Sequence, residues 1–170
     1  MLEPNREILR LERLRKTFPG VLALDGASLS VRAGEAHGLV GENGAGKSTL
    51  IKLLAGAFAS DGGRIVVDGE PLSTVRPARI HAAGVRFVHQ ELNLVPHFTV
   101  AETVFMGQEL QGPFGLSARK MRDLAERFLQ ETLNVRIDPR ALVRDLGVAE
   151  RKLVQIARAL IDDKAKIVVF

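Results

Sequence analysis

The stretch "GENGAGKST", residues 41–49, decides the fold that this chain is expected to adopt. It matches the pattern G-x-x-x-x-G-K-[ST], with Gly41, Gly46, Lys47 and Ser48 at the fixed positions. Glycines let the backbone curl so that successive N–H groups face one anion, and a helix that follows directs its positive end at the same point. The lysine can reach the β- and γ-phosphates of a nucleotide, and the hydroxyl can bind Mg²⁺. The motif therefore predicts a phosphate-binding loop.

The sequence on both sides of the loop fits this prediction. The apolar run "AHGLV", residues 36–40, predicts a buried strand before the loop, and residues 47–57 show apolar side chains at helical spacing. The glycine spacing is not that of the dinucleotide fingerprint, and the chain has no N-K-x-D segment that would read guanine. The predicted nucleotide-binding residues of the loop are Gly41, Asn43, Gly44, Ala45, Gly46, Lys47, Ser48 and Thr49, with Lys47 also catalytic and Ser48 also a metal ligand.

Strands and helices alternate along the chain, which favours an α/β fold with a parallel sheet. The first strand reads as half-buried, and the first two strands are expected to form a separate small antiparallel sheet, whereas residues 92–116 contain several Pro and Gly residues and are expected to be loop-rich. The final stretch "KIVVF" reads as a fully buried strand. The predicted strands cover 8–15, 21–35, 36–40, 62–70, 85–90 and 166–170, and the predicted helices cover 47–57, 76–84, 117–138 and 149–161.

Composition excludes several classes of protein. The 170 residues are 46% apolar and 26% charged, which is ordinary for one globular domain. The absence of cysteine excludes disulfides, thiolate metal sites and a cysteine nucleophile, and the four histidines lack metal-ligand spacing. No apolar run approaches the ~18 residues of a membrane span. We therefore expect a soluble chain that could dock on a membrane protein.

Longer stretches narrow the choice among nucleotide-binding proteins. "GENGAGKSTLIKLLAG" followed by "GGRIVVDGE", with "FPGVLALDGASLSVRAGE" ahead of it, resembles the nucleotide-binding cassette of ABC transporters. "FVHQELNLVPHFTVAETVFMG", residues 87–107, resembles the Q-loop region of the ATPases that power bacterial importers of ribose, galactose, xylose and similar sugars. "LGVAERKLVQIARAL", residues 146–160, stands where that family has its signature motif and helix. The resemblance covers essentially the whole chain.

The resemblance implies an α/β P-loop NTPase core with an N-terminal antiparallel β subdomain and an inserted helical subdomain. "KIVVF" stands where the family has the Walker B strand, so the magnesium-binding Asp and the catalytic Glu would come directly after Phe170. We expect a single partial domain that binds ATP but lacks the residues for efficient hydrolysis. Its predicted parts are a β subdomain in 1–35 and 63–72, a P-loop core in 36–62 and 73–91, a helical subdomain with the signature helix in 92–161, and a truncated Walker B strand in 166–170.

Outside the loop, the resemblance assigns further roles by position. Phe18 falls where the family stacks an aromatic ring on adenine, and Gln90 falls on the glutamine that meets Mg²⁺ or the attacking water. Leu146 and Gly147 begin the signature, which in the family binds the γ-phosphate held by the opposite cassette. The signature departs from the family pattern, because Gly147 replaces a serine, Val148 and Ala149 replace glycines, and Glu150 replaces a glutamine. The change at Gly147 removes one hydrogen bond to phosphate, and the change at Glu150 adds a negative charge.

The implied function is ATP hydrolysis that energises sugar import, with ATP and Mg²⁺ as cofactors. The implied partners are membrane permease subunits, a second ATP-binding cassette that is fused or joined head-to-tail, and indirectly a periplasmic sugar-binding protein. The implied location is peripheral, at the cytoplasmic face of the inner membrane, with no nucleic-acid partner expected. Two alternatives stay open: a non-transport ABC ATPase that acts on the ribosome or nucleic acid, and a non-catalytic ATP-binding fragment.

Overall fold

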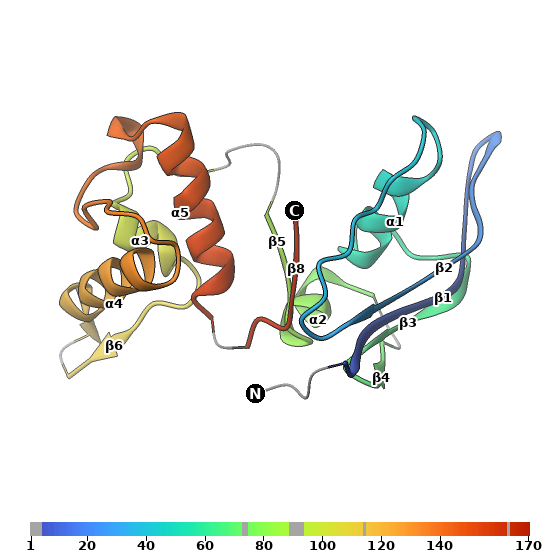
Figure 1. Cartoon of the computed structure of the whole chain (residues 1–170), viewed down its shortest axis with the longest axis horizontal. Coiled ribbons are helices and arrows are strands. Elements are labelled where there is room, and N and C mark those ends of the chain that lie inside the picture. The colour runs from blue at the N-terminus through green and yellow to red at the C-terminus, as the bar shows by residue number, and fades with distance from the viewer. Residues whose placement is uncertain (1–4, 73–74, 89–93, 114, 163) are drawn as a thin grey trace. The chain divides into compact units, whose positions relative to one another are not determined.

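The computed structural model describes residues 5–72, 75–88, 94–113, 115–162 and 164–170 (Figure 1). The chain divides into two compact units, residues 1–85 and 86–170, and each is described by itself. Among the described residues, the helices are all too short or too polar to cross a membrane.

The first unit is built on a four-stranded antiparallel sheet, as predicted for the N-terminal strands. The strand order is β2-β1-β3-β4. Alternating apolar residues of β1 and β3 form its buried face, with Leu11, Leu14, Ile65 and Val67 all almost completely buried. The strands are β1 (Glu7–Phe18), β2 (Val21–Arg32), β3 (Gly62–Val67) and β4 (Glu70–Pro71).

A bulge in β1 keeps its leucines on the buried face. Leu11 pairs with Leu29 but Leu14 pairs with Ala27, so β1 carries one residue more than β2 between these pairs. At the bulge, Arg13 takes a φ of 44° and its N–H donates to Ser28 Oγ at 2.9 Å. On β3, Gly63 takes a φ of +83°, and a Cβ there would lie 2.3 Å from the Glu12 carbonyl oxygen. The bulge therefore requires glycine at position 63.

Two short helices complete this unit, one between β2 and β3 and one after β4. Helix α1 (Lys47–Leu54) buries Leu50, Leu53 and Leu54, and helix α2 (Pro77–Ala82) begins on a proline and buries Ile80. The first helix ends earlier than the predicted residue 57, because Gly56 takes a left-handed φ of 75°. The Ala57 N–H then donates to the Lys52 carbonyl and the Gly56 N–H to the Leu53 carbonyl, both at 3.0 Å, which is a Schellman termination.

The prediction of a buried strand at residues 36–40 is wrong. The segment has no strand assignment, its residues are exposed, and Val40 is 92% exposed. A strand needs a neighbour for its backbone hydrogen bonds, and in the part of the chain that the structure describes this segment has no strand partner. Its composition also does not favour a strand, because Ala36 and Gly38 have low strand propensity.

The second unit packs three helices around an apolar core. Helices α3 (Val100–Val104), α4 (Ala118–Glu131) and α5 (Val148–Leu160) pack against one another. The cluster that they share includes Val104, Ala125 and Val154, which are fully buried. The other elements are strand β5 (Val85–Phe87) paired with β8 (Ile167–Val169), the ribbon of β6 (Gln111–Gly112) and β7 (Gly115–Leu116), and the 3-10 helix η1 (Val143–Asp145).

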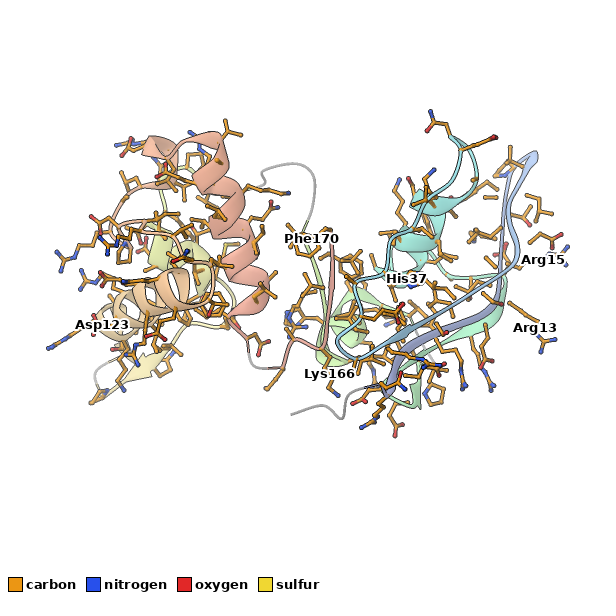
Figure 2. The ribbon with its side chains drawn as sticks, in the orientation of Figure 1. Arg13, Arg15, His37, Asp123, Lys166 and Phe170 are labelled. Atoms are coloured by element: carbon orange, nitrogen blue, oxygen red, sulfur yellow. The ribbon has the colours of Figure 1, made fainter. Side chains whose placement is uncertain are left out.

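Three expectations for this unit need correction. Helix α4 ends near residue 131 and not at Asp138, because Asn134 takes a left-handed φ of 53° and the Val135 N–H closes on the Leu129 carbonyl at 3.0 Å. Residues 100–104 form a short helix that was not predicted within the loop-rich stretch 92–116. Strand β8 is half-buried and not fully buried, and Phe170 beyond it is 75% exposed (Figure 2).

The start of α3 is closed by a reciprocal capping box. The Thr99 N–H donates to Glu102 Oε2 at 2.8 Å, and the Glu102 N–H donates back to Thr99 Oγ1 at 3.2 Å. The bonds from the Thr99 N–H and hydroxyl lower the pKa of Glu102. A carboxyl group with a lowered pKa stabilises the folded state above its unfolded pKa, and this contribution is lost as the pH falls.

Thr99→Ala is expected to destabilise the second unit by about 1 kcal/mol at pH 7, because one half of the box is removed. The difference from wild type should narrow below pH 4.5, the ordinary pKa of the glutamate, as Glu102 becomes protonated. Urea denaturation followed by circular dichroism at pH 7 and pH 4 measures both effects. Thr132→Ala, at the end of α4, is the matched control and should have little effect. A loss of the same size at both pH values would contradict the pH part of the prediction.

Candidate functional site

The loop before α1 is held in a tight curve by two left-handed glycines. Gly44 and Gly46 take φ values of 87° and 85°. A Cβ at Gly46 would lie 2.7 Å from the Ala23 carbonyl oxygen and 2.8 Å from the Leu24 side chain. Gly46 therefore lets the loop close against the start of β2, at a distance that no other residue allows.

Helix α1 starts immediately after this glycine and presents free backbone donors to the loop. The Leu50 N–H donates to the Gly46 carbonyl at 2.9 Å, so the N–H groups of residues 47–49 precede the first intrahelical bond. The first turn carries no acidic side chain that would neutralise the positive end of the helix. These are the electrostatic conditions for binding an anion.

Lys47 folds back over the loop. Its ammonium Nζ donates to the carbonyl oxygens of Gly41 at 2.6 Å and Glu42 at 2.7 Å. These contacts place one positive charge beside the curled backbone. Ser48 in the next position is exposed, so its hydroxyl is accessible to a ligand, and Thr49 is half-buried.

Phe18 lies at the end of β1 and belongs to the same region of the first unit. Its ring meets Phe58 edge-on, with centroids 5.4 Å apart, and Lys16 Nζ lies 5.6 Å from the Phe18 centroid. Phe18 pairs with Val21, two residues before the Ala23 carbonyl that Gly46 approaches. The turn between β1 and β2 and the loop before α1 consequently lie at the same end of this unit (Figure 1).

Asp61 fixes the position of the cation beside this ring. The Lys16 ammonium lies 2.8 Å from Asp61 Oδ1, and the Thr17 N–H donates to Asp61 Oδ2 at 2.7 Å. The bond from Lys16, followed by that from Thr17, lowers the pKa of Asp61, which is therefore ionised at neutral pH. No local sequence pattern predicts this support, because Asp61 is 45 residues from Lys16 along the chain.

The predicted signature residues lie at the start of α5 in the second unit. Leu146 is buried, whereas Gly147 is the N-cap residue with extended backbone angles, φ −65° and ψ 162°. Glycine offers no side-chain acceptor, and the cap is supplied by Glu150, whose Oε2 accepts the Gly147 N–H at 2.7 Å. The exposed position after it is Val148, 73% accessible.

Arg151 supports the signature loop from within the helix. Its guanidinium donates to the Val143 carbonyl at 3.1 Å and to the Arg144 carbonyl at 2.9 Å. These bonds fix the 3-10 turn that leads to Gly147. Sequence reasoning did not identify Arg151, because an arginine on a helix is usually solvated and its target here is backbone.

The remaining predicted residue, Gln90, lies outside the described residues, as does the neighbouring His89. Within the described part of the chain, no group of three or more His, Asp or Glu side chains could hold a metal ion. The structure thus brings the loop and Phe18 together at one end of the first unit, and places Leu146 and Gly147 in the second. The binding roles of all these residues remain predictions.

The site has the three features of a P-loop nucleotide-binding protein. These are a loop curled by glycines, a lysine that contacts the loop backbone, and a helix whose first turn carries no acidic side chain. The sequence comparison goes further: the family described as "ABC transporter" matches residues 24–170. The chain belongs to the ABC transporter family. The nucleotide-binding fold of this family implies a bound nucleotide with a divalent metal.

Known relatives and solved structures agree with this assignment. The chain is 48% identical over 91% of its length to the ribose import ATP-binding protein RbsA 1 of Rubrobacter xylanophilus, and 44% identical over 91% to a putative ribose/galactose/methyl galactoside import ATP-binding protein of Burkholderia ambifaria. It spans 31% and 30% of the lengths of these curated relatives. A nucleotide-free ATP-binding cassette of an ABC transporter superposes with a TM-score of 0.72 and 30% identity, covering 91% of this chain and 65% of the cassette. The predicted fold class is confirmed.

Proposed function

We propose that this chain binds ATP together with Mg²⁺ through residues 41–49, as the nucleotide-binding part of a subunit that hydrolyses ATP to drive sugar import. The observation that carries the proposal is the geometry of the loop. Gly46 brings it against β2, α1 begins without an acidic side chain, and the Lys47 ammonium lies on the loop backbone. The helix start and the ammonium both favour polyphosphate over a neutral ligand.

The residues fit both ATP and its metal. The backbone N–H groups of 47–49 and the Lys47 ammonium suit the phosphates, and the exposed Ser48 hydroxyl suits Mg²⁺, which prefers oxygen ligands. Phe18 offers a half-exposed aromatic face for the adenine ring at the same end of the unit. Ser48 would hold the metal, which would supply positive charge that neutralises the phosphates.

The other proposed roles follow from position in the chain. Lys47 and Gln90 act in catalysis, Gln90 also meets the metal, and Leu146 with Gly147 faces the γ-phosphate of a second cassette. The exposed start of α5 supports the last role, because a helix N-terminus next to a small residue can approach a phosphate closely. The second cassette is fused to this one or pairs with it head-to-tail.

The names of the relatives support sugar as the transported substrate. Proteins similar to this chain at 43–49% identity are named for import of ribose or of ribose, galactose and methyl galactoside. We propose that the whole protein docks on membrane permease subunits at the cytoplasmic face of the inner membrane, and works indirectly with a periplasmic sugar-binding protein. These names favour transport over action on the ribosome or on nucleic acid.

Ser48→Ala is expected to remove most of the gain in ATP affinity that Mg²⁺ provides, because it deletes the hydroxyl oxygen proposed to bind the metal. In the wild-type chain, ATP should bind at least about tenfold more tightly with Mg²⁺ than with EDTA, because the metal neutralises part of the phosphate charge. Isothermal titration of each protein under both conditions measures the gain. Ser30→Ala, an exposed serine on β2, should keep the full gain.

Two results would contradict the proposal. A wild-type chain that binds no ATP under either condition would overturn nucleotide binding altogether. A whole protein that copurifies with nucleic acid rather than with a membrane permease would overturn the transport role while leaving ATP binding in place.

A further inference from the structure

Two buried charges of the second unit lie far from the nucleotide loop in sequence and have no role in the proposed chemistry. Arg86 in strand β5 is only 6% exposed. Its guanidinium is hydrogen-bonded to Asp162 Oδ2, and the Asp162 side chain is also largely buried. Arginine is almost never buried without a partner, because desolvating the guanidinium is costly. The burial of Arg86 together with its partner Asp162 indicates that the structure constrains where this arginine side chain lies.

Asp162 organises the turn that joins α5 to β8. Its Oδ1 accepts the Lys164 N–H at 3.0 Å, and its carbonyl oxygen accepts the Ala165 N–H at 2.8 Å. The residue stands directly after Ile161, the C-cap of α5. The Asp162 side chain thus joins the turn that follows α5 to an arginine of strand β5.

The sheet completes the connection. Strands β5 and β8 pair, and the Val88 N–H donates to the Val169 carbonyl at 2.8 Å (Figure 1). Arg86 is therefore fixed both by its strand and by Asp162. The ion pair joins β5, the strand that leads toward Gln90, to the turn between α5, the helix that begins at Gly147, and β8.

The pair is ionised at neutral pH. Burial acts to raise the pKa of Asp162, but the Lys164 N–H and the Arg86 guanidinium outweigh it, so the pKa lies below its ordinary value. Removing either partner would leave an uncompensated buried charge, so the pair ties the two segments that carry it to one arrangement.

We propose that Arg86 and Asp162 are positioning residues that lock α5 to the β5–β8 pair, so that the signature end of the helix and the segment leading to Gln90 keep a fixed register. The inference rests on the proposed function of those two segments. It assigns the ion pair to turnover and not to nucleotide binding, because the loop at 41–49 and Phe18 lie in the first unit.

The test compares Arg86→Met, Asp162→Asn and the double variant in the whole protein. Each single variant should lower kcat for ATP hydrolysis about ten- to hundredfold, as expected when catalytic groups are misplaced. KM for ATP and the ATP dissociation constant should stay within about twofold of wild type. The double variant should lose no more than either single variant, since both remove the same interaction. Arg10→Met, which breaks an exposed ion pair with Glu12 in the first unit, is the control and should keep kcat.

Hydrogen exchange gives a readout that does not depend on ATP. In Arg86→Met, the amides of Lys164, Ala165 and the last turn of α5 should exchange faster, while those of α4 stay unchanged. Unchanged exchange, additive losses in kcat, or an equal loss of ATP affinity would overturn the positioning role. Faster exchange in a protein that binds no ATP would overturn the proposed function but uphold the lock between α5 and β5.

Discussion

Lys47→Ala is expected to lower the affinity of the chain for Mg·ATP by about ten- to hundredfold without unfolding it. The lysine supplies a charge-assisted hydrogen bond to phosphate, worth about 1.5–3 kcal/mol, and every 1.4 kcal/mol is about tenfold in affinity. Among the described residues, its ammonium donates to the Gly41 and Glu42 carbonyls of the exposed loop, for which water can substitute. The fold should therefore remain.

Isothermal titration with Mg·ATP measures this change, and circular dichroism checks that the fold is kept. Lys52→Ala removes the same charge from an exposed position of the same helix and should bind as wild type. Equal weakening in both variants would show that the effect is general electrostatic attraction, and unaltered binding in Lys47→Ala would remove the loop from the site.

Gly63→Ala is expected to destabilise the first unit by roughly 2–5 kcal/mol, the sum of the left-handed backbone cost and of steric overpacking. Its φ is +83°, and the new Cβ would lie 2.3 Å from the Glu12 carbonyl oxygen and 2.4 Å from that of Arg13. Both oxygens belong to the bulge of β1, so β1 and β3 must separate or the bulge must open.

The neighbouring glycine provides the matched control. Gly62 has no left-handed φ, and a Cβ there would meet only the Arg15 Cβ at 3.7 Å, an ordinary contact. Gly62→Ala should therefore change stability little. Urea denaturation followed by circular dichroism compares the two variants, and equal stability would show that the bulge is free to relax.

Local signals in the sequence predicted the elements that depend on local interactions. Alternating leucines identified β1, and helical spacing identified α4 and α5. The capping box at Thr99 and Glu102 was readable as T-x-x-E, but α3 has only five residues, too few for a periodic pattern. The strand predicted at residues 36–40 was wrong because it depends on a non-local condition. An apolar run forms a strand only where neighbouring strands pair with its backbone hydrogen-bonding groups.

The residues of the candidate site also fall into those that local sequence predicts and those that depend on distant parts of the chain. The loop at 41–49 could be located from its motif, because the glycines and the helix start act within a few residues of one another. The support for Phe18 from Lys16 and Asp61, and the pair of Arg86 with Asp162, join residues 45 and 76 positions apart. Such contacts follow from the tertiary fold, and no pattern in a single sequence specifies them.

At the start of α5, Glu150 competes through its carboxylate with any bound phosphate for the Gly147 N–H. Its carboxylate is tethered three residues from the Gly147 N–H that it accepts, so its effective concentration at this helix end is far above that of any free anion. The helix consequently has its own counter-charge and needs no external ligand to be capped. An incoming phosphate must displace the Glu150 carboxylate from the Gly147 N–H. The affinity for phosphate at this end is therefore the difference between the binding free energies of the phosphate and of the carboxylate.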